Sequence, residues 1–284
     1  YCSNLQSIEI PNSVTSIGVD AFSYCSSLES ITVNIDNQHY QTQNSVLFSK
    51  DMTTLIKYPA KKNLNSYEIP NSVTSICNYA FQYCTNLESI KIPDSIKSIG
   101  DYAFQYCTNL TTIKIPDSVT SLGRFAFQYC SSLTSMGIPN IITSIDDYAF
   151  SGCSNIESIT IPSSVTSIGN HAFARCSNVA SIDIPDSVTS IGDYAFSSCS
   201  SLAHIEIPNG ITSIGNGAFH YCSSMATIDI PNTVKSIGNS AFQDCSNLAT
   251  IEIPNSVTSI GHYAFEYCSN MKRFAISSHI PKIR

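Results

Sequence analysis

Residues 103–125 read AFQYCTNLTTIKIPDSVTSLGRF, and variants of this stretch follow one another along most of the chain. The stretch is 23 residues long, and the same step separates its equivalent positions. A fixed period of this length is the sequence signature of a solenoid in which each repeat forms one coil. The Ala-Phe pair, the cysteine and the proline all keep the step, from Ala80 to Ala264, from Cys84 to Cys268 and from Pro70 to Pro254.

Each repeat contains two short stretches in which apolar and polar residues alternate. Ile90 and Ile92 share one face of the first stretch, and the second runs over residues 119–122. A period of two predicts β-strands. Pro116 follows the first strand and is typical of the second position of a type I turn. The segment 125–130 has room for about one helical turn.

A repeat this short cannot bury both of its faces alone, so identical repeats must stack. Strands of successive coils would then pair in parallel, about 4.8 Å apart. The fold class that we predict is a repeat solenoid, mainly β, of 23-residue units with parallel strands and short helical turns. The period lies within the leucine-rich repeat range, and a plain β-helix is the main structural alternative.

Two places break the period within what we expect to be a single solenoid over residues 1–284. From Pro11 to Pro70 the distance is 59 residues, which is two periods and 13 more. The extra residues lie within 34–67, where the apolar stretches 46–48 and 55–58 predict a projecting β-hairpin. At the other end, residues 277–284 leave the pattern. Because the chain opens within a repeat and without Met, we interpret it as a fragment of a longer protein.

The repeat resembles the BspA-type (treponemal-type) class of leucine-rich repeats. The resemblance rests on about nine matching positions per repeat over nearly the whole chain. It implies a right-handed curved arc on the surface of an anaerobic bacterium or a parasitic protist. It also implies adhesion to host proteins, matrix or other cells, and the class shares no catalytic residues. One repeat with the motif is Leu87-x-x-Ile90-x-Ile92-Pro93-x-x-Ile96-x-x-Ile99-Gly100-x-x-Ala103-Phe104-x-x-Cys107.

Composition and motifs exclude several function classes. The formal net charge is -7 and the pI is about 5.2, which argues against a nucleic-acid partner and against anionic membranes. No apolar run approaches the roughly 18 residues that span a bilayer, so no direct membrane insertion is expected. No serine-hydrolase, zinc-protease or phosphate-loop motif occurs. We therefore expect no enzyme activity and no cofactor.

The cysteines of the repeat form a column, because they share one position in successive coils. A metal site needs ligands that converge on one point, whereas these thiols lie along an axis. We therefore interpret them as small buried hydrophobic side chains. Cys77 is outside the column and replaces a glycine, so it is a candidate exposed and reactive thiol.

Between the two isoleucine-type positions of the first strand, one residue per repeat should face outward on the concave side. We call this set the outward row. Four successive acids in it suggest a cationic partner or a carboxylate ladder that binds Ca²⁺, and a merely solvated face is the alternative. The candidate ligand-binding residues are Lys91, Lys114, Asp183, Glu206, Asp229 and Glu252; the rest of the row is Glu9, Thr32, Gly137 and Thr160.

Tyrosines form two further columns, which we expect to stack on each other and to seal the convex edge. Our leading functional hypothesis is an extracellular or cell-surface adhesion module that binds a host protein, a matrix protein or another surface protein. A structural spacer that displays another domain and a substrate-docking region of a larger enzyme are the alternatives. The tyrosine columns are Tyr79, Tyr102, Tyr148, Tyr194, Tyr263 and Tyr24, Tyr83, Tyr106, Tyr129, Tyr221, Tyr267.

Overall fold

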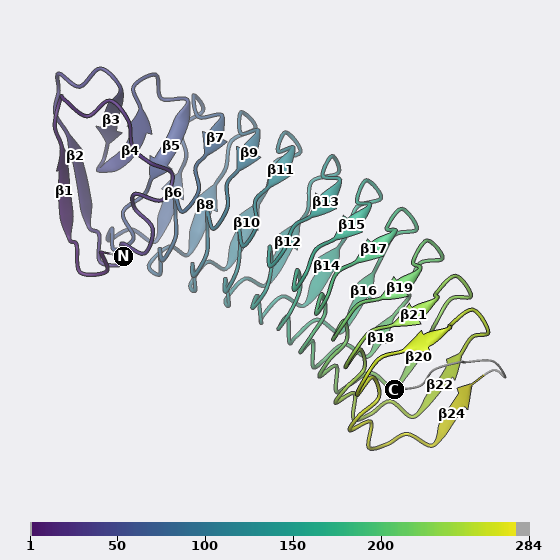
Figure 1. Ribbon diagram of the computed structural model, residues 1–284. Helices are drawn as coiled ribbons and strands as arrows, with labels where there is room; N and C mark the ends of the chain where they lie inside the picture. Colours follow the sequence, from purple (N-terminus) through teal and green to yellow (C-terminus); the bar gives the residue numbers. More distant parts are fainter. Residues whose placement is uncertain (1, 277–284) are drawn as a thin grey trace. The chain divides into compact units, whose positions relative to one another are not determined.

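The computed structural model of the protein describes residues 2–276, in which no α-helix occurs. The chain forms two compact units, an N-terminal unit of Tyr1–Ile141 and a C-terminal unit of Ile142–Arg284. Figure 1 shows that the strands of each unit are stacked in chain order. Each unit is therefore a β-solenoid, as the 23-residue period predicts. The irregular end expected at residues 277–284 lies outside the described residues.

In the N-terminal unit most coils contribute a first strand before the proline and a second strand before the glycine. The first strands β6, β8, β10 and β12 pair side by side in that order, and β1 pairs with β2. All of these pairs are parallel. The first strands are β1 (Ser7–Ile10), β2 (Ser30–Val33), β6 (Ser66–Glu68), β8 (Ser89–Lys91), β10 (Thr112–Lys114) and β12 (Ser135–Gly137). The second strands are β7 (Ser75–Ile76), β9 (Ser98–Ile99) and β11 (Ser121–Leu122).

In the C-terminal unit the same two kinds of strand alternate, and both sets pair in parallel. The first strands form two ladders, β14-β16-β18 and β20-β22-β24, and the second strands form β13-β15-β17 and β19-β21-β23. The first strands are β14 (Ser158–Thr160), β16 (Ser181–Asp183), β18 (His204–Ile205), β20 (Thr227–Asp229), β22 (Thr250–Ile253) and β24 (Arg273–Ile276). The second strands are β13 (Ser144–Ile145), β15 (Ser167–Ile168), β17 (Ser190–Ile191), β19 (Ser213–Ile214), β21 (Ser236–Ile237) and β23 (Ser259–Ile260).

The longer repeat contains three antiparallel strands, β3 (Tyr40–Gln43), β4 (Val46–Ser49) and β5 (Thr54–Lys57). They do not project, because β5 pairs in parallel with β7 and continues the sheet of second strands. The apolar residues of β4 are fully buried. Lys57 is also buried, and its ammonium donates a hydrogen bond to the Tyr79 carbonyl at 2.7 Å. Burial lowers the pKa of Lys57.

The expected helical turn is replaced by a run of tighter turns. The N–H groups of Ala103, Gln105 and Cys107 donate to carbonyls three residues earlier. The alternate N–H groups, of Tyr102, Phe104 and Tyr106, donate instead to carbonyls of the next coil at 2.7–2.9 Å. Tyr102 and Tyr106 adopt φ of 58° and 60° to make this possible. A helix cannot form here, since every second N–H group belongs to the neighbouring coil.

The core consists of columns in which the same side chain recurs in successive coils. Phe81, Phe104 and Phe127 stack with ring centroids 4.9 and 5.1 Å apart and planes within 7° of parallel. The cysteine column beside them is buried from Cys25 to Cys268 and contains no disulfide bond, as the sequence predicts, whereas Cys2 at its start is exposed. The Cys107 thiol donates to the Phe81 carbonyl at 3.1 Å. The S–H group of such a thiol thus finds its hydrogen-bond acceptor within the stack.

The tyrosine columns stack as predicted, although each is broken where a coil supplies no aromatic ring. In the N-terminal unit Tyr83 and Tyr106 are parallel at 4.8 Å, and Tyr79 and Tyr102 at 4.7 Å. Tyr221 has serine and aspartate at the equivalent positions of its neighbours, and half of its surface is exposed. A tyrosine therefore seals the edge only where an adjacent coil also supplies a ring.

A glutamine ladder, which the sequence reading missed, runs between the two tyrosine columns of the N-terminal unit. The Gln82 amide donates to Gln105 at 2.6 Å, and the Gln105 amide donates to Gln128 at 2.5 Å. All three side chains are buried. Identical amides at the same place in successive coils satisfy each other's hydrogen bonds.

In the C-terminal unit, His171 takes the place of a tyrosine. Its ring lies parallel to those of Tyr148 and Tyr194, with centroids 4.4 and 4.9 Å away. Burial lowers the pKa of His171 below its ordinary value of 6.5, and the carboxylates of Asp147 and Asp193 only partly oppose this. The neutral imidazole therefore stacks as an aromatic ring.

We predict that His171→Tyr makes the stability of the protein less dependent on pH. The unfolded chain binds a proton on His171 at a higher pH than the folded chain does. The free energy of unfolding therefore decreases as the pH falls through 6.5. Tyrosine removes this contribution, and denaturant unfolding between pH 8 and pH 5 would measure it. His262→Asn, at an exposed position, serves as the control; equal pH profiles for wild type and His171→Tyr would contradict the prediction.

Candidate ligand-binding face

The outward row is exposed because the first strands alternate between the core and the solvent. In β10 the side chain of Ile113 is buried, whereas Thr112 and Lys114 on either side are exposed. β14, β16, β20 and β22 repeat this pattern, so one face of each unit presents the row. All six predicted ligand-binding residues lie on this face and are exposed: Lys91, Lys114, Asp183, Glu206, Asp229 and Glu252.

In the N-terminal unit the row reads Glu68, Lys91, Lys114 and Gly137 on four adjacent strands. The Lys91 ammonium lies 2.5 Å from the Glu68 carboxylate. The two lysines are therefore not equivalent, because Lys91 is neutralised by its neighbour and Lys114 has no such partner in the described chain. Both side chains of the ion pair are more than 60% exposed, so the pair contributes little to stability.

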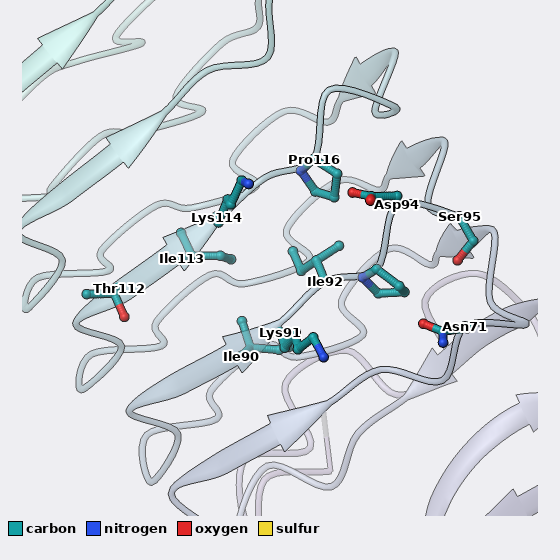
Figure 2. A pocket seen from close by; sticks show the side chains of 11 residues that line it. Asn71, Ile90, Lys91, Ile92, Asp94, Ser95, Thr112, Ile113, Lys114 and Pro116 are labelled. Atoms are coloured by element: carbon teal, nitrogen blue, oxygen red, sulfur yellow. The ribbon is translucent and has the colours of Figure 1, made fainter.

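A groove with a volume of about 690 Å³ lies over β8 and β10. Figure 2 shows Lys91 and Lys114 on neighbouring strands of this groove, which Ile90, Ile92 and Ile113 also line. The remaining walls come from the turns after the strands and from Thr112: Asn71, Pro93, Asp94, Ser95, Thr112 and Pro116. The N-terminal groove thus combines ammonium groups with a small apolar floor.

In the C-terminal unit the four acids of the row belong to two separate ladders. Asp183 lies in β16, and Glu206 directly follows β18, which pairs with β16. Asp229 and Glu252 are paired in register on β20 and β22. No ladder joins β18 to β20 among the described strands of this unit. The continuous four-carboxylate ladder expected from the sequence is therefore interrupted between Glu206 and Asp229.

A second groove, of about 280 Å³, lies at this interruption. Glu206 and Asp229 line it from its two sides, together with isoleucines of the same strands. His204 is on the same face as Glu206, with 3.6 Å between the imidazole Nε2 and a carboxylate oxygen. The C-terminal groove is therefore acidic, and its carboxylates face solvent.

The sequence reading missed two residues of this face. Glu68 belongs to the outward row because it stands two residues before Pro70, as Lys91 stands two before Pro93. That spacing indicates Glu68, but the 23-residue register is hard to follow there because the longer repeat comes just before it. The histidines follow no period in the sequence, so the repeat pattern does not indicate His204; its position two residues before Glu206 is the available signal.

The carboxylates of the row do not gather in the group of three or more side chains that would hold a metal ion. In residues 2–276, no three His, Cys, Asp or Glu side chains come together in a way that could hold a metal ion. Nothing in this arrangement favours Ca²⁺ over a cationic side chain as the ligand. The same residues also include no helix with the length and apolar character that crossing a bilayer requires.

Cys77 is not the exposed thiol that its place outside the column suggested. It is half-buried, and burial raises the pKa of its thiol. Cys2 is exposed instead. Since the thiolate is the reactive form, a raised pKa disfavours reaction of Cys77 at neutral pH. Its reactivity remains a prediction to be measured.

The comparisons with known proteins agree with the repeat pattern. A family model described as a BspA type leucine rich repeat region matches residues 1–61, 57–180 and 167–284. No curated protein shows significant similarity to the chain.

Two solved bacterial structures are similar to this chain. A leucine-rich repeat protein from Eubacterium ventriosum is 28% identical, with a TM-score of 0.55 over 95% of this chain and 60% of that one. A leucine rich cell surface protein from Faecalibacterium prausnitzii is 29% identical, with a TM-score of 0.53 over 98% of this chain and 81% of that one. The chain thus spans less than two thirds of the Eubacterium protein.

We predict that a thiol reagent distinguishes the cysteines by burial. Cys2 should react at once in the native protein, Cys77 slowly, and the cysteine column only after unfolding. Burial raises the pKa of Cys199 to about 12, for example, so almost no thiolate is present at neutral pH. Titration with a chromogenic disulfide, with and without denaturant, would count the reactive thiols. Rapid reaction of many thiols in the native protein would show that the column is accessible.

Proposed function

This chain belongs to the BspA-type leucine-rich repeat family, and we propose that it is a protein-binding module of a cell-surface protein. Its binding surface is the outward face of the first strands. The partner is a host protein, a matrix protein or another surface protein. The similarity to a Faecalibacterium cell surface protein supports an extracellular location.

The proposal rests on one observation: charged residues are exposed at the same position of successive repeats that are otherwise uniform. The core positions must match from coil to coil, whereas the outward row is free to vary. It nevertheless carries acids in each of four successive coils of the C-terminal unit, from Asp183 to Glu252. Like charges on adjacent strands destabilise a sheet. A ligand that bears positive charge would offset this cost.

The distribution of charge along the chain also supports a cationic partner. Residues 142–284 contain eleven Asp or Glu and six Lys or Arg, whereas residues 1–141 contain ten and eight. The excess negative charge therefore lies in the C-terminal unit. A surface of one sign steers an oppositely charged partner and raises its association rate. A basic segment whose side chains reach Glu206 and Asp229 fits the C-terminal groove.

We predict that the double variant Glu206→Ser/Asp229→Ser binds a cationic partner about tenfold more weakly than the wild type, because two exposed ion pairs are lost. Binding would be measured by biolayer interferometry against matrix proteins and a lysine-rich peptide, at two salt concentrations. The matched control is Glu157→Ser/Asp186→Ser, which removes the same charge from exposed positions that do not line the groove.

Circular dichroism and thermal unfolding would show that both double variants keep the native fold. If both double variants bind the cationic partner equally weakly, only the net charge of the protein matters. If both bind it as tightly as the wild type does, the proposed surface is contradicted. That result would favour a spacer that displays another domain, or a docking region of a larger enzyme.

A further inference from the structure

We propose that the N-terminal groove is a separate subsite that binds an acidic peptide segment, with a glutamate or aspartate side chain of the segment on Lys114. This inference rests on the proposed recognition function, but it concerns different residues in a different unit. It assigns opposite charge preferences to the two grooves.

The first argument is the charge balance along the row. On adjacent strands Glu68 pairs with Lys91, and Lys91 lies across from Lys114. Lys91 forms its ion pair with Glu68, on the side away from Lys114. The Lys114 ammonium therefore makes no hydrogen bond or ion pair within residues 2–276 and has a like charge as its neighbour. Of Glu68, Lys91 and Lys114, it is the charge that a ligand would compensate.

The second argument is the open space on the other side of Lys114. Its partner on β12 is Gly137, and a β-carbon placed there would meet no atom within 4 Å. No side chain therefore covers the Lys114 ammonium from that strand. A carboxylate can approach it from the solvent without displacing any group of the described chain.

The third argument is the chemistry of the groove walls, which favours a peptide over a sugar. None of the eleven lining residues is aromatic, whereas stacking on rings is a common way to bind the apolar face of a flat or cyclic ligand. The apolar residues of the groove are buried and expose only a narrow strip to it: Ile90, Ile92, Ile113, Pro93 and Pro116. Aliphatic side chains of an extended segment fit such a surface.

The far wall of the groove adds a hydrogen-bond acceptor. Asp94 is exposed on the turn after β8 and forms no ion pair with Lys114. Its carboxylate would accept a backbone N–H group of the bound segment, while Lys114 holds the acidic side chain. An extended peptide carries both groups, because its N–H donors recur along the backbone. A compact inorganic anion carries only the negative charge.

The test pairs variants of the whole chain with two blocked hexapeptides that have a central Glu or Gln between valines. Isothermal titration calorimetry would measure the dissociation constants. We expect Lys114→Gln to weaken binding of the Glu peptide about tenfold, as for loss of a charged hydrogen bond. The Gln peptide should bind the wild type about tenfold more weakly than the Glu peptide does. Lys114→Gln should change the affinity for the Gln peptide little, because the effect of Lys114 depends on the carboxylate of the peptide.

Lys97→Gln is the matched control, since it removes the same charge from an exposed position of the same unit outside the groove. Lys114→Glu should reject the Glu peptide and bind a peptide with a central Lys instead. Three results would overturn the proposal: no binding of the Glu peptide to the wild type, equal weakening by Lys97→Gln, or equal affinity for the Glu and Gln peptides. If inorganic phosphate displaces the Glu peptide as effectively as unlabelled Glu peptide does, the groove is a simple anion site. That result would also overturn the proposal.

The outcomes separate this inference from the proposed function. Suppose that Glu206→Ser/Asp229→Ser no longer binds the cationic partner and that Lys114→Gln leaves the affinity for the Glu peptide unchanged. The proposed C-terminal surface is then supported and the acidic-peptide subsite is contradicted. If Lys114→Gln alone has an effect, the N-terminal groove is the binding site and the acidic row is a solvated face.

Discussion

The structure depends on one constraint: residues 23 positions apart must occupy the same place in successive coils, so that the backbone of each coil bonds to the next. Each coil meets this constraint at the first strand, at the second strand and at the turn segment that carries the Ala-Phe pair. In that segment Phe104 N–H donates to the carbonyl of Ala126 in the next coil. Threonine hydroxyls add to the same ladder, as when Thr120 donates to the Lys97 carbonyl at 3.1 Å.

The same constraint explains the side-chain columns. Once the backbones are in register, identical side chains lie one above another at the spacing of a β-sheet. This spacing suits flat rings, as in the stack of Phe81 on Phe104, and amides that bond to their own copies, as in Gln82 and Gln105. It also explains why tyrosines tolerate positive φ. The backbone of Tyr102 is strained there, and the coil-to-coil hydrogen bond and the ring stacking offset that cost.

The regular core leaves the outward row as the part of each coil that is free to differ. In a solenoid the core columns repeat, so variation on the solvent face changes binding without changing the fold. The two units use this freedom differently. One carries an ion pair and a lysine that has no partner in the part of the chain that the structure describes. The other carries carboxylates around an interruption of the strand ladder.

The sequence by itself determined the period, the two strands per coil, the burial of the cysteines and the side of the strand on which Lys114 lies. These follow from spacing alone, because a period of two fixes which face a side chain occupies and a period of 23 fixes which side chains stack. The tertiary structure decided what depends on contacts between coils. Bonding to the next coil replaced the expected helical turn, as seen at residues 102–107. The antiparallel strands of residues 40–57 joined the sheet instead of projecting from it. The pairing of Lys91 with Glu68, which leaves Lys114 without a partner among residues 2–276, was likewise decided by the tertiary structure. Ion pairing depends on where two flexible side chains meet in space.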